Sequence, residues 1–191
     1  KRRRAVVSAL AGPAAGPPGL RARAARTAAP VHGAARAAAA APADGGAVSA
    51  ILGIDAETLI DLCATHAHGE VVQCANFNAP GQIAIAGHSA AVARVGDAAK
   101  TAGAKKVIPL AVSAPVHTEL MRPAADRLAE LFAATKIEAP SLPVIHNVDV
   151  SIRADETDIK QALYDQMFSA VLWSDTVTYM AANGVENTVE C

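Results

Sequence analysis

Short apolar runs alternate with segments of helical periodicity in the middle of the chain. The run from Val48 to Ile54 predicts a strand, and Asp55 directly after it is a favourable N-cap for a helix. Apolar residues then recur at helical spacing, at Ala56, Leu59, Ile60 and Cys63. Gly69 is expected to end this helix. A strand followed by an amphipathic helix is therefore expected at residues 48–69.

The same alternation continues to residue 110. Apolar runs predict three more strands, at residues 71–76, 82–86 and 107–110. A turn at 78–81 separates the first two, and a helix capped by Ser89 and ended by Gly103 precedes the third. Its expected apolar face consists of Val92, Val95, Ala98 and Ala102. The resulting strand–helix–strand–strand–helix–strand order predicts a ferredoxin-like subdomain at residues 46–110.

Residues 111–191 show the pattern of a larger α/β layer. A helix is expected from Pro123, with one apolar face made of Leu120, Met121, Ala124, Ala125, Leu128 and Phe132. A buried strand is predicted at 143–148, and two further helices at 158–168 and 174–183.

The first 45 residues have a different character from the rest. Residues 1–43 hold eight basic residues and no acidic one, whereas residues 44–191 hold nine basic and eighteen acidic residues. This segment is also rich in Ala, Gly and Pro and lacks apolar periodicity. Three interpretations remain open: an organelle transit peptide, a basic arm for nucleic acid, or a stretch that is not the native reading of the gene. The low aromatic content, 3%, counts against nucleic-acid binding.

Composition narrows the class of protein. The chain has 191 residues, 52% hydrophobic and 18% charged, which suits a globular domain and excludes disorder of the whole chain. No apolar run is long enough to span a membrane. Three cysteines are too few for a disulfide scaffold, so a reducing, cytoplasmic setting is expected.

A few residues could carry chemistry. His117 lies in a predicted loop between a strand and a helix, where it could act as a general base or simply be structural. Gln166 lies at the margin of an apolar helix face and needs hydrogen-bond partners if it is buried. Asn76 and Asn78 bracket Phe77, and turn formation explains them equally well.

Metal and phosphate sites are not expected. Four residues of metal-ligating type lie close together in the sequence: Cys63, His66, His68 and Cys74. Cys63, however, belongs to a predicted apolar helix face, so these residues are not expected to bind a metal. The chain also lacks the glycine-rich motifs G-x-x-x-x-G-K-[ST] and G-x-G-x-x-G that bind phosphate groups. We therefore predict neither a metal nor a cofactor.

Several motifs, in this order and at this spacing, resemble one family. They are G-A-V-S-A-I-L-G at 46–53, N-F-N-A-P-G-Q-I-A-I-A-G-H at 76–88, V-S-A-P-V-H at 112–117, H-N-V-D at 146–149 and Q-M-F at 166–168. Together they are similar to bacterial malonyl-CoA:acyl carrier protein transacylases, and the resemblance covers residues 46–191. It implies a ferredoxin-like small subdomain, residues 46–110, inserted in a hydrolase-like α/β acyltransferase core, of which residues 111–191 are part.

The resemblance also implies a reaction. Members of that family move a malonyl group from coenzyme A to the phosphopantetheine thiol of acyl carrier protein through an acyl-serine intermediate. By motif, His117 would be the base and Gln166 would hold it through a main-chain carbonyl. The residues expected to contact substrate are Asn76, Asn78, Ser113 and Asn147. We expect a monomer that binds malonyl-CoA and acyl carrier protein, without nucleic acid or membrane.

One part of the family pattern is missing. The chain contains no G-x-S-x-G elbow and no recognisable arginine motif for the malonyl carboxylate. An ungapped count places the elbow serine near Arg3, so residues 1–45 have the length of the family segment without its residues. We therefore expect an out-of-frame stretch there, in a core truncated at both ends.

Two alternatives stay open. One is an acyltransferase domain of a polyketide synthase, in which the position of Val116 bears on the choice of acyl group. The other is a catalytically inert fragment that only binds acyl carrier protein through Lys105, Lys106 or Arg122.

Overall fold

The computed structural model describes residues 6–8, 46–112 and 114–188. The expectations for the rest of the N-terminal segment, and for Ser113, fall outside the described residues.

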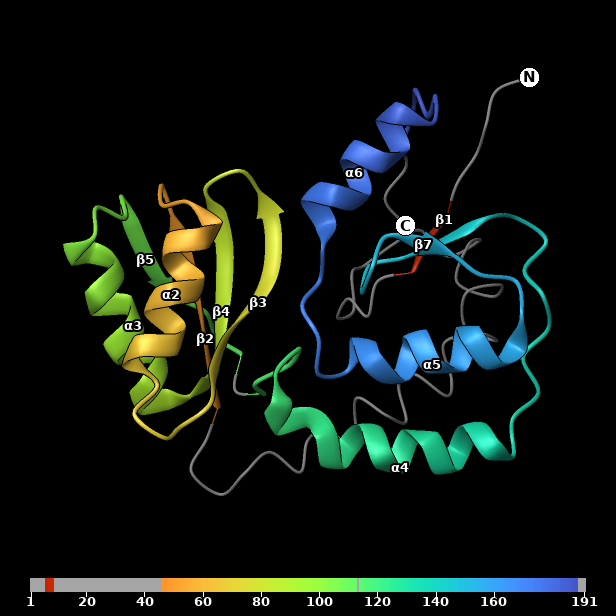
Figure 1. Ribbon diagram of the computed structural model, residues 1–191, viewed down its shortest axis with the longest axis horizontal. Helices are drawn as coiled ribbons and strands as arrows, with labels where there is room; N and C mark the ends of the chain where they lie inside the picture. Colours follow the sequence, from red (N-terminus) through yellow and green to blue (C-terminus); the bar gives the residue numbers. More distant parts are fainter. Residues whose placement is uncertain (1–5, 9–45, 113, 189–191) are drawn as a thin grey trace.

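A four-stranded antiparallel sheet forms the first half of the described chain (Figure 1). Its strands are β2 (Gly46–Leu52), β3 (Val72–Ala79), β4 (Gln82–His88) and β5 (Lys106–Pro109), in the order β3-β4-β2-β5. Helices α2 (Ala56–His66) and α3 (Ser89–Thr101) cover one face. The predicted element order is confirmed, whereas the domain boundary at residue 110 stays a prediction.

Local side chains explain where α2 begins and which face it buries. The Asp55 carboxylate accepts hydrogen bonds from the backbone N–H and the hydroxyl of Thr58, both at 2.8 Å, as an N-cap should. Leu59 and Cys63 are buried as predicted. Ile60 is 49% exposed, so its assignment to the apolar face was wrong.

The second helix differs from the prediction in two details. It begins at Ser89, with His88 at the N-cap position, so Ser89 is not the cap. Its buried residues are Ala91, Val92, Val95, Gly96 and Ala99, while Ala98 is half-buried and Ala102 is exposed. Alanine and glycine are small enough to be buried or exposed at little cost in free energy. Their spacing therefore does not determine which face of an alanine-rich helix is buried.

The core of this half lies between the sheet and its two helices. Ile51, Leu59, Ile85 and Val95 are fully buried there. The opposite face of the sheet buries a second, smaller-residue cluster made of Val48, Ala75, Ala84 and Ala86.

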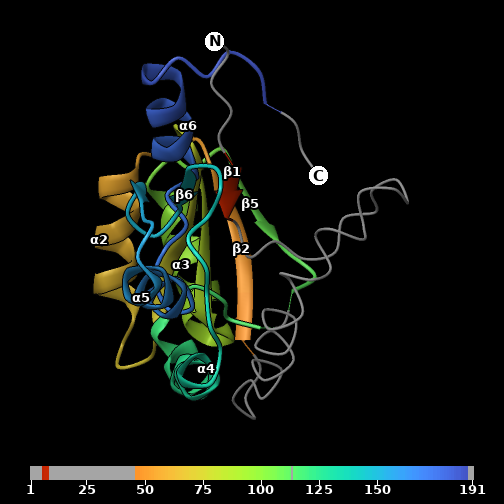
Figure 2. The same cartoon turned by 90° about the vertical axis from the view of Figure 1, so that its right-hand side faces the viewer.

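The second half contains a small sheet and a pair of packed helices. Strand β6 (Val144–His146) pairs in parallel with β1 (Val6–Ser8) and antiparallel with β7 (Ser151–Ile152). A short 3₁₀ turn, η1 (Glu119–Met121), leads into α4 (Arg122–Ala133). This helix packs on α5 (Glu156–Gln166) through a cluster built around Met121, Ala125, Leu128, Phe132 and Met167. Figure 2 shows α4 at one end of the molecule and α6 (Trp173–Ala182) at the other.

A short segment joins the two halves. Val171 donates its N–H to the carbonyl of Ala75 on β3 and accepts from the N–H of Phe77, both at 2.9 Å. The next residue, Leu172, donates to the carbonyl of Asn147 at 2.9 Å, directly after β6. We call residues 166–172 the linking segment, because they run from the end of α5 to both sheets. Within the described ranges, no helix combines the length and the apolar character needed to cross a bilayer.

Candidate active site

His117 lies in a tight turn before η1. The Thr118 hydroxyl donates to the Pro115 carbonyl at 2.6 Å, and the Val116 N–H donates to the Ala114 carbonyl at 2.8 Å. His117 adopts φ = 62°, a left-handed conformation that costs a non-glycine residue about 1–2 kcal/mol. Such a conformation persists only where contacts with the surrounding structure offset its cost. Residues of this kind cluster at functional sites.

Gly46 allows this turn to lie against the sheet. A Cβ atom on Gly46 would stand 2.4 Å from Cδ of Pro115, closer than real side chains approach. The first residue of β2 is therefore glycine for a steric reason. The contact ties the position of the His117 turn to the first residue of β2, an inner strand of the four-stranded sheet.

The imidazole of His117 points to the end of α5. Its Nδ1 atom lies 2.8 Å from the main-chain oxygen of Gln166, and its backbone N–H donates to the Met167 carbonyl at 3.2 Å. A carbonyl oxygen only accepts, so Nδ1 carries the proton. In the neutral ring the lone pair is then on Nε2. This is the tautomer that a general base requires.

The side chain of Gln166 fixes that carbonyl. The residue is 5% exposed, and its Nε2 donates to the Ser169 carbonyl at 3.0 Å and to the Ala170 carbonyl at 3.4 Å. Nε2 also lies 3.5 Å from His117 Nδ1, but two donors face each other there, so this contact is not a hydrogen bond. The Gln166 side chain thus holds residues 166–170 in a turn through the Ser169 and Ala170 carbonyls. The main-chain oxygen of the same residue accepts the hydrogen bond from His117.

Burial keeps the imidazole neutral. His117 is 7% exposed, and desolvation lowers the pKa of its ring below the usual 6.5. The Gln166 carbonyl, which accepts the hydrogen bond from Nδ1, and the carbonyl of Ser169 both oppose this shift. The net direction is downward, so His117 is uncharged at neutral pH and able to accept a proton.

Asn147 lies at the carboxyl end of β6, beside the same segment. It is 1% exposed, and within the described residues its amide nitrogen and oxygen are the buried side-chain polar atoms without a hydrogen-bond partner. Its main-chain oxygen accepts from Leu172 at 2.9 Å. An unsatisfied buried amide is costly, which makes this position a candidate for contact with a ligand.

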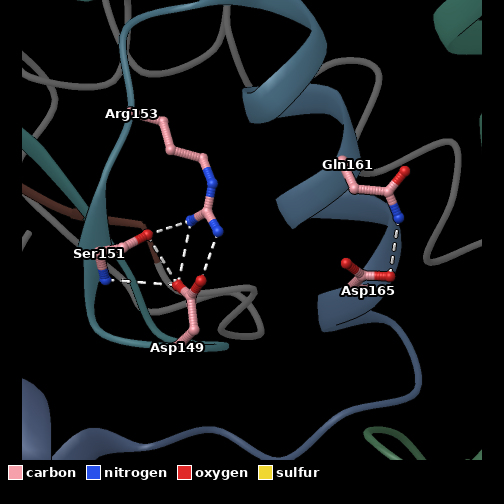
Figure 3. Close-up of polar contacts among 5 residues, drawn as sticks. All are labelled: Asp149, Ser151, Arg153, Gln161 and Asp165. Atoms are coloured by element: carbon pink, nitrogen blue, oxygen red, sulfur yellow. Dashed lines mark hydrogen bonds and ion pairs between the residues drawn. The ribbon is translucent and has the colours of Figure 1, made fainter.

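The turn after Asn147 is held by a polar cluster (Figure 3). The Asp149 carboxylate accepts from the Ser151 hydroxyl at 2.9 Å and pairs with both terminal nitrogens of Arg153. The Arg153 guanidinium holds the pKa of Asp149 below its usual value, so the pair is charged at neutral pH. Val150 completes the turn in a left-handed conformation, φ = 57°. The cluster fixes the chain directly after Asn147.

The other predicted contact residues are placed differently. Asn76 lies on β3 and bridges to Val171, so it borders the linking segment. Asn78 is exposed on the same strand, and no described contact brings its side chain to His117. Ser113 lies outside the described residues. His117 contacts Gln166 and Met167 at the start of residues 166–172, whereas Asn76 and Asn147 contact Val171 and Leu172 at the end of this segment through backbone atoms.

Sequence reasoning missed the carbonyls of Ser169 and Ala170. They accept hydrogen bonds from the Gln166 side chain. Because every residue has a main-chain carbonyl, the sequence does not indicate which carbonyls act in this way. Among the described residues, no group of three or more His, Cys, Asp or Glu is arranged to hold a metal ion. His66 and His68 stack on each other with ring centroids 6.4 Å apart, while Cys63 and Cys74 belong to the core.

Comparisons with known proteins agree on one family. The chain is 47% identical over 149 residues to the malonyl CoA-acyl carrier protein transacylase of Escherichia coli (strain K12), covering 78% of this chain and 48% of that protein. It is 47% identical to the structure of an acyl carrier protein S-malonyltransferase from Vibrio cholerae, with a TM-score of 0.80 over 82% of this chain and 52% of the other. No family model matches the chain.

A third relative is a structure of a malonyl-transacylase in complex with a holo type II polyketide synthase acyl-carrier protein. It is 42% identical, with a TM-score of 0.80, and covers 82% of this chain and 51% of the other. The chain thus spans about half the length of the relatives it matches. Over that half, sequence and fold agree, and the chain is similar to malonyl CoA-acyl carrier protein transacylases.

Proposed function

We propose that this chain takes part in transfer of a malonyl group from coenzyme A to the phosphopantetheine thiol of acyl carrier protein, with His117 as the general base. The observation that carries the proposal is the hydrogen bond from Nδ1 of His117 to the Gln166 carbonyl. It leaves Nε2 as the basic nitrogen, in a chain 47% identical to a malonyl CoA-acyl carrier protein transacylase.

The proton transfers follow from this geometry. In the first half-reaction, Nε2 takes the proton of a serine hydroxyl as the serine attacks the malonyl thioester, and the imidazolium returns that proton to the departing coenzyme A sulfur. In the second half-reaction, Nε2 takes the proton of the carrier thiol, which attacks the acyl-serine, and returns it to the departing serine oxygen. Each time the imidazolium that forms is stabilised by the Gln166 carbonyl rather than by a carboxylate. No G-x-S-x-G motif identifies the serine in these 191 residues.

We assign substrate contacts to Asn76, Asn78, Ser113 and Asn147. The unpaired amide of Asn147 supports its place in this set, because a polar ligand atom would satisfy it. We also propose that residues 46–110 form a small subdomain over part of a larger subdomain at 111–191. A monomer that requires no cofactor is expected. The free thiols Cys63 and Cys74 support a cytoplasmic location.

The identity of the carrier protein has two candidates. A fatty-acid carrier is the first, because the curated relatives carry the name malonyl CoA-acyl carrier protein transacylase. A polyketide carrier is the second, because a 42% identical malonyl-transacylase is seen bound to one. Transfer to each purified carrier protein, measured side by side, distinguishes them.

A second candidate function is binding of acyl carrier protein without transfer. The missing serine motif favours it, and so do two exposed lysines at the start of β5, Lys105 and Lys106, which suit an acidic partner. Arg122 is less suited to this role. It already pairs with Glu119 at 2.7 Å, and its guanidinium carbon lies 3.9 Å from the centre of the Phe168 ring.

Incubation with radiolabelled malonyl-CoA tests the proposal. The purified chain and its His117→Ala variant are incubated, denatured and digested, and the labelled peptide is identified. Label on a serine, lost in His117→Ala, supports transfer through an acyl-enzyme. If neither protein retains label although the unmodified chain binds acyl carrier protein, the binding function replaces the transfer function.

A further inference from the structure

A glutamine on β3 contacts the chain directly after His117. The Oε1 atom of Gln73 accepts a hydrogen bond from the backbone N–H of Glu119 at 2.8 Å, across 46 residues of sequence. Strand β3 is the edge strand of the four-stranded sheet that lies beside the second half of the described chain (Figure 1). The hydrogen bond therefore joins a side chain of the first half to the main chain of the second.

The sheet register explains the direction of the Gln73 side chain. Gln73 is opposite Ala86 on β4, and Ala86 is opposite Val48 on β2. Ala86 and Val48 belong to the apolar cluster on the face of the sheet away from α2 and α3. Because residues paired across strands share a face, Gln73 is the long polar side chain on this face. The Glu119 N–H supplies the hydrogen-bond partner that such a side chain needs.

Two contacts with the sheet lie on either side of His117. Pro115, two residues before it, packs against Gly46 of β2, and Glu119, two residues after it, bonds to Gln73 of β3. Thr118 does not take the place of Gln73, because its hydroxyl donates to the Pro115 carbonyl and makes no cap hydrogen bond with η1. The Gln73 contact therefore fixes the side of the turn that Gly46 does not reach.

Strand β3 also holds the partner of His117. Ala75 and Phe77 form backbone hydrogen bonds with Val171, at the end of the linking segment that begins with Gln166. Residues 73–77 thus contact both the turn that carries the imidazole and the segment that carries its carbonyl acceptor. Loss of the Gln73 contact should loosen the hydrogen bond between the two, whereas a change elsewhere on the sheet should not.

We propose that Gln73 is a positioning residue for His117: its side-chain oxygen holds the Glu119 N–H and thereby fixes the imidazole against the Gln166 carbonyl. Gln73 acts through the main chain at Glu119 and not on the ring itself. This role rests on the proposed function of His117 as the base.

Three variants of the full chain test the proposal. Gln73→Met keeps the length of the side chain and removes the oxygen acceptor. Gln73→Glu keeps an oxygen at this place, and a carboxylate accepts a backbone hydrogen bond at least as well as an amide does. The matched control is Gln82→Met, which makes the same change at an exposed position of the neighbouring strand β4.

The measurement is the rate at which the His117 Nδ1 proton, which the Gln166 carbonyl accepts, exchanges with water. It is followed by NMR of the ¹⁵N-labelled chains at neutral pH, together with the backbone amides of β4, a strand that is paired on both sides. In Gln73→Met, the Nδ1 proton should exchange about two- to tenfold faster, the factor that corresponds to one hydrogen bond.

The β4 amides should keep their exchange rates in Gln73→Met. Glu119 is exposed, so water can replace the Gln73 oxygen at its N–H, but water cannot hold that N–H against β3. In Gln73→Glu and Gln82→Met, the Nδ1 proton should exchange at the rate of the unmodified chain.

Three results would overturn the proposal. The first is an unchanged Nδ1 exchange rate in Gln73→Met. The second is equal acceleration of the Nδ1 proton and the β4 amides, because Gln73 would then act only on overall stability. The third is exchange in Gln73→Glu as fast as in Gln73→Met, because an oxygen acceptor would then not hold the turn.

Retention of radiolabelled malonyl groups tests the transfer function separately. If no chain retains label while the exchange rates differ as expected, the transfer function fails and the positioning of His117 by Gln73 stands. If the unmodified chain retains label on a serine while Gln73→Met leaves the Nδ1 exchange rate unchanged, transfer stands and the positioning role fails.

Discussion

The Nδ1 atom of His117 lies 2.8 Å from the main-chain oxygen of Gln166, 49 residues later in the chain. The partner of the histidine is therefore a neutral carbonyl. A carboxylate at this place would raise the pKa of the ring by its charge, whereas the carbonyl orients the ring with a weaker effect. Desolvation then dominates, and the pKa of His117 is lowered.

This contact predicts the protonation state of His117. Nitrogen-detected NMR of the ¹⁵N-labelled chain should show a neutral ring at pH 7, with the proton on Nδ1 and a pKa below the reference value of about 6.5. The resonance is assigned by its loss in His117→Asn. A proton on Nε2 at pH 7 would contradict the deduced tautomer.

The side chain of Gln166 should contribute to stability through two carbonyls. Gln166→Met keeps the length of the side chain but leaves the oxygens of Ser169 and Ala170 without this donor. We expect a loss of about 1–3 kcal/mol in the free energy of unfolding, measured with urea. The His117 resonance should shift as well, because the Gln166 carbonyl that bonds to the ring is no longer held in place by the Gln166 side chain.

Gln161→Met is the matched control for that variant. Gln161 lies on the same helix, and its exposed side chain donates to the Asp165 carboxylate at 2.9 Å (Figure 3). Its loss should change the free energy of unfolding by less than about 0.5 kcal/mol. Equal losses in the two variants would show that Gln166 acts merely through helix propensity.

The fold of residues 46–110 could be predicted because periodicity and caps agree there. The run before Asp55 and the spacing of Leu59 and Cys63 give the correct strand and helix. Errors arose at Ser89 and Ala98, where short side chains carry little information about burial. The alanine-rich face of α3 is decided by the sheet that it packs against, which no local pattern contains.

The candidate site was predicted less completely, for a different reason. The histidine could be found because the residues around it form a distinctive motif. Its contacts with the carbonyls of Gln166 and Met167 depend on main-chain atoms that every residue has. The missing partner of Asn147 likewise depends on where the chain places its neighbours. Such features require the folded structure.

Gly46 should not tolerate even one additional carbon. In Gly46→Ala, the new Cβ would overlap Pro115, so the turn that carries His117 must move away from β2. We expect a loss of about 1–3 kcal/mol in the free energy of unfolding, as in other overpacked sites, together with a shifted His117 resonance. Gly69→Ala, at φ = 84° with nothing within 4 Å of its Cβ, should lose stability while leaving that resonance in place.

Stability should fall when the solution is acidified below about pH 6.5. The pKa values of His117 and His146 are both lowered by burial, so below the reference value the unfolded chain binds more protons than the folded chain. The free energy of unfolding therefore decreases as the pH falls from the unfolded pKa towards the folded pKa values. Below those values, these two groups add no further loss.

Urea unfolding at pH 7.5, 6.5 and 5.5 measures this dependence. His146→Asn should make the dependence shallower, whatever it does to the stability at pH 7.5. Asp149 does not interfere, because its lowered pKa confines its contribution to pH values below about 3.8. A free energy of unfolding that rises on acidification to pH 5.5 would show that the buried histidines prefer the charged form.

Asn147 offers a test of whether a buried residue is present for stability or for binding. Its amide is buried without a hydrogen-bond partner, which costs about 1–3 kcal/mol by mutational comparison. Asn147→Leu has a similar size and no polar atoms, so the free energy of unfolding should stay equal or rise. The opposite result is expected for Gln166→Met, because that amide is paired. A clear loss of stability in Asn147→Leu would mean that the amide is satisfied in solution, and the residue would then no longer be a candidate for contact with the acyl substrate.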